Sequence, residues 1–141
     1  MLDSLLPIKE ELIKAQSVLI IAHIQPDGDT LGSCYALQEA LCSAGKKADI
    51  CCDSDMPEKY TAVFDKELLK QPDEISGEYD VMAALDCADK ARLGKALKAF
   101  KKHDNTINVD HHITNDGFAK LNYVVEASSV GEIVFEMLKE L

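Results

Sequence analysis

The sequence has no apolar run approaching the ~20 residues of a transmembrane helix, and its start, Met1-Leu2-Asp3, lacks the cationic and apolar parts of a signal peptide. Positive charge is also scarce, because 15 lysines and arginines stand against 25 acidic residues and give a formal net charge of -10. An acidic surface repels phosphate backbones, whereas long nucleic acids normally meet a basic groove. These shortages predict a cytoplasmic protein that contacts neither a membrane nor a long duplex.

No Cys-x-x-Cys pair occurs, although the chain has five cysteines. Their number is odd, and Cys51 and Cys52 are adjacent, which is not the pattern of a disulfide framework. Neither disulfides nor a structural zinc site is therefore expected. Cys87 follows Asp86 and could border a site, but packing as a small hydrophobic residue is the favoured interpretation.

Composition and hydrophobic patterning fit one domain. The 141 residues are 47% hydrophobic and 28% charged, which is typical of a globular protein with its own core. Apolar segments of strand character are 17–22, 48–52, 80–85, 106–109 and 121–125. Segments of helical character are 2–16, 30–44, 57–69, 90–102 and 130–141. This alternation predicts an α/β fold of three α/β/α layers, with helices on both faces of a mostly parallel, Rossmann-like sheet of about five strands.

Three of the expected strands end in side chains that commonly bind metal ions. The strands and the residues that follow them are 17–22 with His23, Asp27 and Asp29; 80–85 with Asp86; and 106–109 with Asp110-His111-His112. The carboxyl ends of parallel strands share one edge of the sheet, where open α/β folds bind their ligands. We therefore expect these side chains to converge on one site.

Carboxylates mixed with imidazoles suit Mn²⁺ or Mg²⁺ better than zinc. Asp27 and Asp29 are two residues apart, so each can reach a different ion of a pair, and Asp86 is the natural bridge between the ions. Two ions held roughly 3.5–4 Å apart activate a water and neutralise charge on a phosphoryl group. An ordinary polar turn is the alternative for Pro26-Asp27-Gly28-Asp29 alone, but three such strand ends together favour a metal site.

The ordered motifs resemble those of the DHH phosphoesterase superfamily. The matching stretches are His23-x-x-Pro26-Asp27-x-Asp29-x-x-Gly32-Ser33, Leu85-Asp86, Arg92-Leu93-Gly94, Asp110-His111-His112 and Ala127-Ser128-Ser129-x-x-Glu132. The third and the last are most similar to the subfamily of nano-RNases and pAp (adenosine 3′,5′-bisphosphate) phosphatases. The resemblance runs from about residue 5 to the end of the chain.

The resemblance implies a role for each site residue. His23 and Asp27 are expected to bind a first metal, Asp29 and His111 a second, and Asp86 both. His112 is expected to face the substrate phosphate as a donor or general acid, and Asp110 to position His111. Ser33 and Arg92 are candidate phosphate contacts, although a surface salt bridge is an equal alternative for Arg92.

The implied activity is Mn²⁺-dependent hydrolysis, by a two-metal mechanism, of phosphate esters in short oligonucleotides or pAp. An inorganic pyrophosphatase of the same superfamily is the alternative enzyme, and Mg²⁺ and a homodimer both stay open. Relatives carry a fourth motif of the Thr-Asp-Thr-Gly type and then a smaller substrate-binding domain. Neither occurs here, so residues 1–141 are expected to be a single, incomplete N-terminal domain. As such, the chain could also be a non-catalytic metal-binding module.

Overall fold

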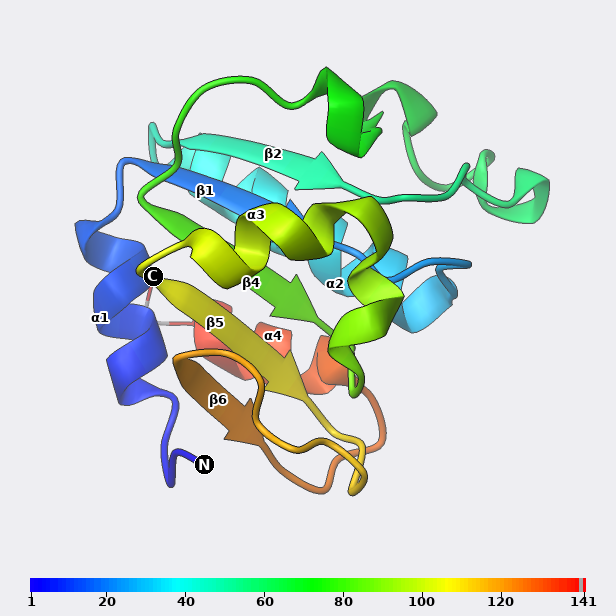
Figure 1. Cartoon of the computed structure of the whole chain (residues 1–141). Coiled ribbons are helices and arrows are strands. Elements are labelled where there is room, and N and C mark those ends of the chain that lie inside the picture. The colour runs from blue at the N-terminus through cyan, green and yellow to red at the C-terminus, as the bar shows by residue number, and fades with distance from the viewer. Residues whose placement is uncertain (140) are drawn as a thin grey trace.

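A single six-stranded sheet forms the centre of the protein (Figure 1). The structure is a computed structural model and describes residues 1–139 and 141. All neighbouring strands are parallel, in the order β3-β2-β1-β4-β5-β6. The strands are β1 Ser17–Ile21, β2 Lys47–Cys51, β3 Leu69–Lys70, β4 Val81–Leu85, β5 Thr106–Asp110 and β6 Leu121–Val124. The parallel, Rossmann-like sheet predicted from the sequence is confirmed, with one strand more than expected.

Helices cover both faces of this sheet. The elements are α1 Leu6–Lys14, α2 Gly28–Ser43, α3 Leu97–Lys102, α4 Val130–Leu138 and the 3-10 segment η4 Lys90–Ala96. Buried residues of α1, α2 and α4 pack against one face of the sheet, and those of η4 and α3 against the other. The part of the chain that the structure describes contains no helix long and apolar enough to cross a membrane.

Alternation along β1 shows why its sequence is apolar throughout. Val18 and Ile20 belong to the cluster under α1 and α2, whereas Leu19 and Ile21 belong to the cluster under α3. Each side chain is at most 3% exposed. Burial of one such side chain contributes roughly 1.5–3 kcal/mol, so a polar residue at any of these positions would be costly.

The segment 57–69 was expected to be a helix, and this expectation is wrong. The structure has two short 3-10 turns there, Glu58–Tyr60 and Lys66–Leu68, and then the two-residue strand β3. Tyr60 and Phe64 pack against the large core cluster, so tertiary contacts determine the path of this segment. The Asp65 side chain then accepts a hydrogen bond from the Glu67 amide and caps the second turn.

The expected helix 90–102 is kinked at Gly94, within η4, and α3 follows from Leu97. Gly94 has φ 58° and ψ −134°, a backbone conformation that residues other than glycine rarely adopt. The other expected helices are present: α1 and α4 are shorter than expected, and α2 begins two residues earlier than expected, at Gly28. The last one ends at Leu138 in the structure, and residue 140 lies outside the described residues.

The strand order creates a switch point between β1 and β4. From β1 the chain adds β2 and β3 on one side, and then returns to add β4, β5 and β6 on the other. Loops that leave the carboxyl ends of β1 and β4 therefore diverge and open a crevice, which is where open α/β sheets bind ligands. The predicted metal-binding residues follow β1, β4 and β5 at this edge.

Gly94→Ala should destabilise the fold by roughly 3 kcal/mol or more, because backbone strain and a steric clash add together. A methyl group at Gly94 would meet the Asp53 side chain, which accepts a hydrogen bond from the Lys95 amide. Gly45→Ala is the matched control, since Gly45 also has positive φ (81°) but open space around it, and should cost only roughly 1–2 kcal/mol. Urea unfolding measures both, and equal losses would contradict the clash.

Candidate functional site

The three strand ends bring their polar side chains together around Asp86. One group contains His23, Asp27 and Asp86, and a second contains Asp86, Asp110, His111 and His112. Within each group one ligand atom per residue lies within 4.8 Å of the others. Asp86 belongs to both groups, which is what a bridging ligand requires. The convergence expected from the sequence is therefore present, and the individual metal roles stay predictions.

Asp86 is held in an unfavourable environment. It is 3% exposed, it has φ 58°, and its Oδ1 atom is buried without a hydrogen-bond partner in the described part of the chain. Burial raises the pKa of this carboxyl, and the charges of Asp29 and Asp27 raise it further. A carboxylate oxygen without a donor, facing further carboxylates, fits a cation as its missing partner.

The first group is organised by Thr30, a residue that the sequence analysis did not select. The Thr30 Oγ1 atom lies 2.6 Å from His23 Nε2, 2.7 Å from Asp86 Oδ2 and 3.0 Å from Asp27 Oδ1. His23 Nδ1 lies 2.7 Å from the Ile24 carbonyl and donates there, so in the neutral ring Nε2 is an acceptor. One hydroxyl proton thus faces three acceptors, so the group is short of positive charge.

Asp27 also begins α2, because its side chain accepts a hydrogen bond from the Thr30 amide at 2.9 Å. Burial acts to raise its pKa, but the Thr30 amide and hydroxyl, His23 and Arg92 together hold the pKa below the usual value. The carboxylate is consequently kept ionised. The Asp27-x-x-Thr30 spacing is that of a helix N-cap and its third residue, and this signal could have identified Thr30 from the sequence.

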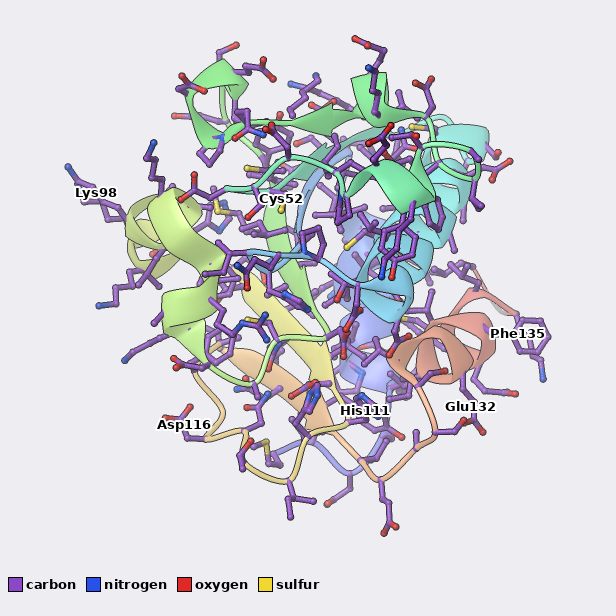
Figure 2. The ribbon with its side chains drawn as sticks, turned by 90° about the vertical axis from the view of Figure 1, so that its right-hand side faces the viewer. Cys52, Lys98, His111, Asp116, Glu132 and Phe135 are labelled. Atoms are coloured by element: carbon purple, nitrogen blue, oxygen red, sulfur yellow. The ribbon has the colours of Figure 1, made fainter. Side chains whose placement is uncertain are left out.

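The Nε2 atom of His111 faces the carboxylates of Asp86 and Asp29. The ring's Nδ1 atom lies 2.9 Å from the Ala127 carbonyl, and its Nε2 atom lies 3.4 Å from Asp86 Oδ1 and 3.8 Å from Asp29 Oδ2. The hydrogen bond to Ala127 raises the pKa of His111 despite partial burial, and the nearby carboxylates add to the rise. Figure 2 shows His111 beside the start of α4.

Asp110 was expected to position His111, and this expectation is wrong. Asp110 Oδ1 instead accepts a hydrogen bond of 2.6 Å from His112 Nδ1. Asp110 is the last residue of β5, and both histidines lie in the irregular segment after it, where the His112 ring comes within hydrogen-bond distance of Asp110. Asp110 therefore positions the exposed imidazole of His112, while the Ala127 carbonyl positions His111.

A buried amide network lies beneath Asp110. Asn115 Nδ2 lies 2.8 Å from Asp110 Oδ2 and 2.6 Å from Asn108 Oδ1. These hydrogen bonds hold the loop that follows Asp110-His111-His112. The sequence analysis missed Asn108 and Asn115 because their pairing exists only in the tertiary structure. Cys87, beside this network, is 1% exposed, and burial raises its thiol pKa to about 12, so the expected packing role is confirmed.

Asp29 joins the site to α4. Its Oδ2 and Oδ1 atoms accept hydrogen bonds of 2.9 Å from the amides of Val130 and Gly131, the first residues of that helix. Ser33 is 1% exposed, and its Oγ lies 3.5 Å from Asp29 Oδ1, so its hydroxyl supports Asp29 from behind. A direct phosphate contact by Ser33 stays a prediction.

Arg92 lies at the rim of the site. Its Nη2 atom donates to the Ile24 carbonyl at 3.1 Å, the same oxygen that His23 Nδ1 contacts. The Ile24 amide in turn donates to the Arg92 carbonyl at 2.8 Å. The arginine thus braces the loop after β1 while remaining exposed, and its use as a phosphate clamp stays a prediction.

The model of the DHH family, N-terminal domain, matches residues 17–141. The chain is 33% identical over 135 residues to a protein of Thermus thermophilus named bifunctional oligoribonuclease and PAP phosphatase NrnA, and the match covers 93% of this chain. It is also 30% identical over 129 residues to a protein of Streptococcus mutans named probable bifunctional oligoribonuclease and PAP phosphatase NrnA, and this match covers 86% of the chain. In both cases the chain spans only 38% of the relative.

A solved structure shares the fold. It is described as an exopolyphosphatase-related protein from Bacteroides fragilis, and it superposes with a TM-score of 0.86 at 22% sequence identity. The match covers 95% of this chain and 42% of that one.

Asp86→Asn should stabilise the metal-free chain at neutral pH by roughly 1–3 kcal/mol, the range for a buried polar group that gains its missing partner. Asparagine tolerates positive φ, still accepts from Thr30 and adds a donor toward His111 Nε2. Asp110→Asn is the control and should destabilise, because both Asp110 oxygens already accept hydrogen bonds. Urea unfolding with a chelator measures both. A destabilised Asp86→Asn protein would show that Asp86 is not electrostatically strained.

The stability gain of Asp86→Asn should also depend on pH. Because the folded-state pKa of Asp86 is raised above 3.8, the folded wild type binds this proton more strongly than the unfolded chain. As pH falls through that raised pKa, the metal-free wild type should gain stability relative to the variant. Unfolding free energies measured from neutral to acidic pH should therefore converge, and a difference independent of pH would contradict the assignment.

Proposed function

The chain belongs to the DHH family, whose N-terminal domain it matches over residues 17–141, and from this membership we propose a metal-dependent phosphoesterase that acts on short oligonucleotides or pAp. The observation that carries the proposal is the buried carboxylate of Asp86, shared between two groups of potential metal ligands. The relatives named as oligoribonuclease and PAP phosphatase support the substrate class. Since the chain spans 38% of their length, the activity is proposed for the complete protein.

The donor chemistry supports Mn²⁺, with Mg²⁺ as the second choice. Carboxylate oxygens and imidazole nitrogens are the candidate ligand atoms on both sides of Asp86, and thiolates are absent from the described groups. We assign His23 and Asp27 to one ion and His111 and Asp29 to the other. Such a pair of bound ions supplies an activated water and neutralises charge on the phosphoryl group.

His112 is the residue best placed for proton transfer. Its side chain is 46% exposed, whereas its partner Asp110 is fully buried. Asp110 fixes the ring by accepting from Nδ1, which leaves Nε2 to carry or release a proton at the leaving oxygen. Asp110 acts through His112 and is therefore a positioning residue.

The charge of the chain favours small substrates. A net charge of -10 opposes a long polyanion, whereas two divalent cations at the site would offset the nearby carboxylates for a small phosphate ester. All five cysteines are free thiols, which supports a reducing compartment, and we propose the cytoplasm.

Millimolar Mn²⁺ should raise the melting temperature of the wild type at neutral pH, because an ion that binds only the folded chain stabilises it by ligand linkage, by about 2.7 kcal/mol at 100 times its Kd. Asp86→Asn should melt higher than the wild type without metal and respond less to Mn²⁺. Thermal melts with chelator and with Mn²⁺ test both. An equal rise in the two proteins would place the bound ion elsewhere.

Asp86→Ala should reduce Mn²⁺-dependent hydrolysis by the complete protein to near background, because both ligand groups lose a member. Activity is measured on pAp, dinucleotides and pyrophosphate at saturating Mn²⁺. Gly45→Ala, remote from the site, should retain wild-type turnover. Near-normal turnover by Asp86→Ala would contradict the shared role, and rapid turnover of pyrophosphate alone would favour the pyrophosphatase.

A further inference from the structure

A pocket of about 360 Å³ opens directly beside the first ligand group. The loop after β1 contributes Pro26 and Asp27 to its wall, and the loop after β2 contributes Ser54, Asp55, Lys59 and Tyr60. Asp27 belongs both to this wall and to the group with His23 and Asp86. A phosphate ester held at the metal ligands therefore has this pocket as a neighbouring space for the rest of its molecule.

The two loops that form the pocket are fixed to each other. The Gln25 amide donates to Ser54 Oγ at 2.9 Å, and Gln25 is held at φ 52°, which a residue other than glycine rarely adopts. Within the second loop, the Tyr60 amide donates to the Pro57 carbonyl at 2.9 Å. The Tyr60 ring packs beside Phe64, with ring centroids 6.4 Å apart. The pocket is thus preformed, and backbone strain occurs where it meets the ligand group.

The lining of the pocket is suited to a nucleoside. The half-buried ring of Tyr60 offers an aromatic surface, and bases stack on such rings with little dependence on sequence. The Lys59 ammonium lies 5.0 Å from the centre of this ring and can meet a phosphate, while the exposed Asp55 carboxylate can accept from ribose hydroxyls. A volume of about 360 Å³ is at the lower end for small-molecule sites and is enough for one nucleoside.

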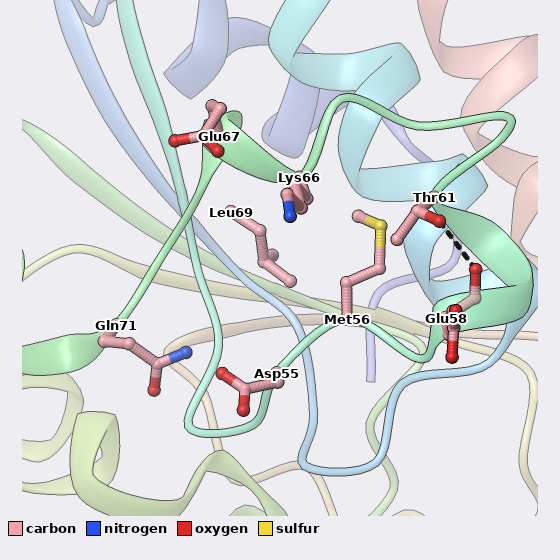
Figure 3. A pocket seen from close by; sticks show the side chains of 8 residues that line it. All are labelled: Asp55, Met56, Glu58, Thr61, Lys66, Glu67, Leu69 and Gln71. Atoms are coloured by element: carbon pink, nitrogen blue, oxygen red, sulfur yellow. Dashed lines mark hydrogen bonds between the residues drawn. The ribbon is translucent and has the colours of Figure 1, made fainter.

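Two other cavities fit this role less well. The larger one, about 490 Å³, is lined by Asp55, Glu58 and Glu67 with the single lysine Lys66, and among the described residues it has no aromatic ring on which a base could stack (Figure 3). A cavity of about 200 Å³ is lined by lysines and phenylalanines, but it borders Thr106, at the end of β5 opposite Asp110. Neither contains a residue of the two ligand groups.

We propose that the pocket lined by Tyr60 and Lys59 binds the nucleoside attached to the reacting phosphate, with its base against the Tyr60 ring. This assignment rests on the proposed phosphoesterase function and deepens it. No base-specific contact is needed, so all four bases are accepted.

The test compares binding of AMP and inorganic phosphate to the complete protein with Mg²⁺ or with Mn²⁺, by calorimetry, in three forms. Wild type and Tyr60→Phe, which keeps the ring, should bind AMP more tightly than phosphate. Tyr60→Leu keeps an apolar side chain against Phe64 but removes the stacking surface, and should weaken AMP binding roughly 5- to 150-fold, the range for one stacked base. Its affinity for inorganic phosphate should not change, which also verifies that the variant is folded.

The outcomes separate the two proposals. If phosphate binds but AMP binds no more tightly, or if Tyr60→Leu retains wild-type affinity for AMP, the nucleoside pocket is wrong while the phosphoesterase site stands. If neither compound binds with Mg²⁺ or with Mn²⁺, the proposed function fails and the pocket assignment fails with it.

Discussion

The burial of one carboxylate, that of Asp86, is the constraint on which the site depends. Parallel pairing of β4 with β1 and β5 carries Asp86 to the edge where the sheet changes direction, and a positive φ turns its side chain back into the site. There Oδ2 accepts from Thr30, while Oδ1 has no donor within the described chain. A fold optimised only for stability would not place a charge there, and the cost is understandable if a cation completes the site.

Around Asp86, the candidate metal ligands His23, Asp27 and His111 are each oriented by a contact with a backbone carbonyl or with Thr30. The Ile24 and Ala127 carbonyls fix the rings of His23 and His111, and Thr30 holds the carboxylate of Asp27. Such outer contacts set the tautomer and direction of metal ligands before any ion binds. Asp29 connects the site to α4, because its carboxylate accepts hydrogen bonds from the first amides of that helix and also lies near His111 Nε2.

The parallel sheet and the convergence of the site could be predicted from the sequence because strands buried on both faces are apolar throughout and end abruptly in polar residues. The segment 57–69 could not, because Tyr60 and Phe64 have the four-residue spacing of a helix, while the segment forms two short 3-10 turns and the strand β3. The partner of Asp110 was misassigned because adjacency in sequence was taken for adjacency in space, whereas Asp110 forms its hydrogen bond with His112, two residues further on. Asn115 was missed because its role exists only in the tertiary structure.

The most direct measurement is anomalous scattering at the manganese edge from crystals of the complete protein grown with Mn²⁺. The account predicts two peaks on either side of Asp86, one contacted by His23 and Asp27 and the other by His111. A single peak that does not touch Asp86, or manganese bound away from the carboxyl ends of β1, β4 and β5, would contradict it.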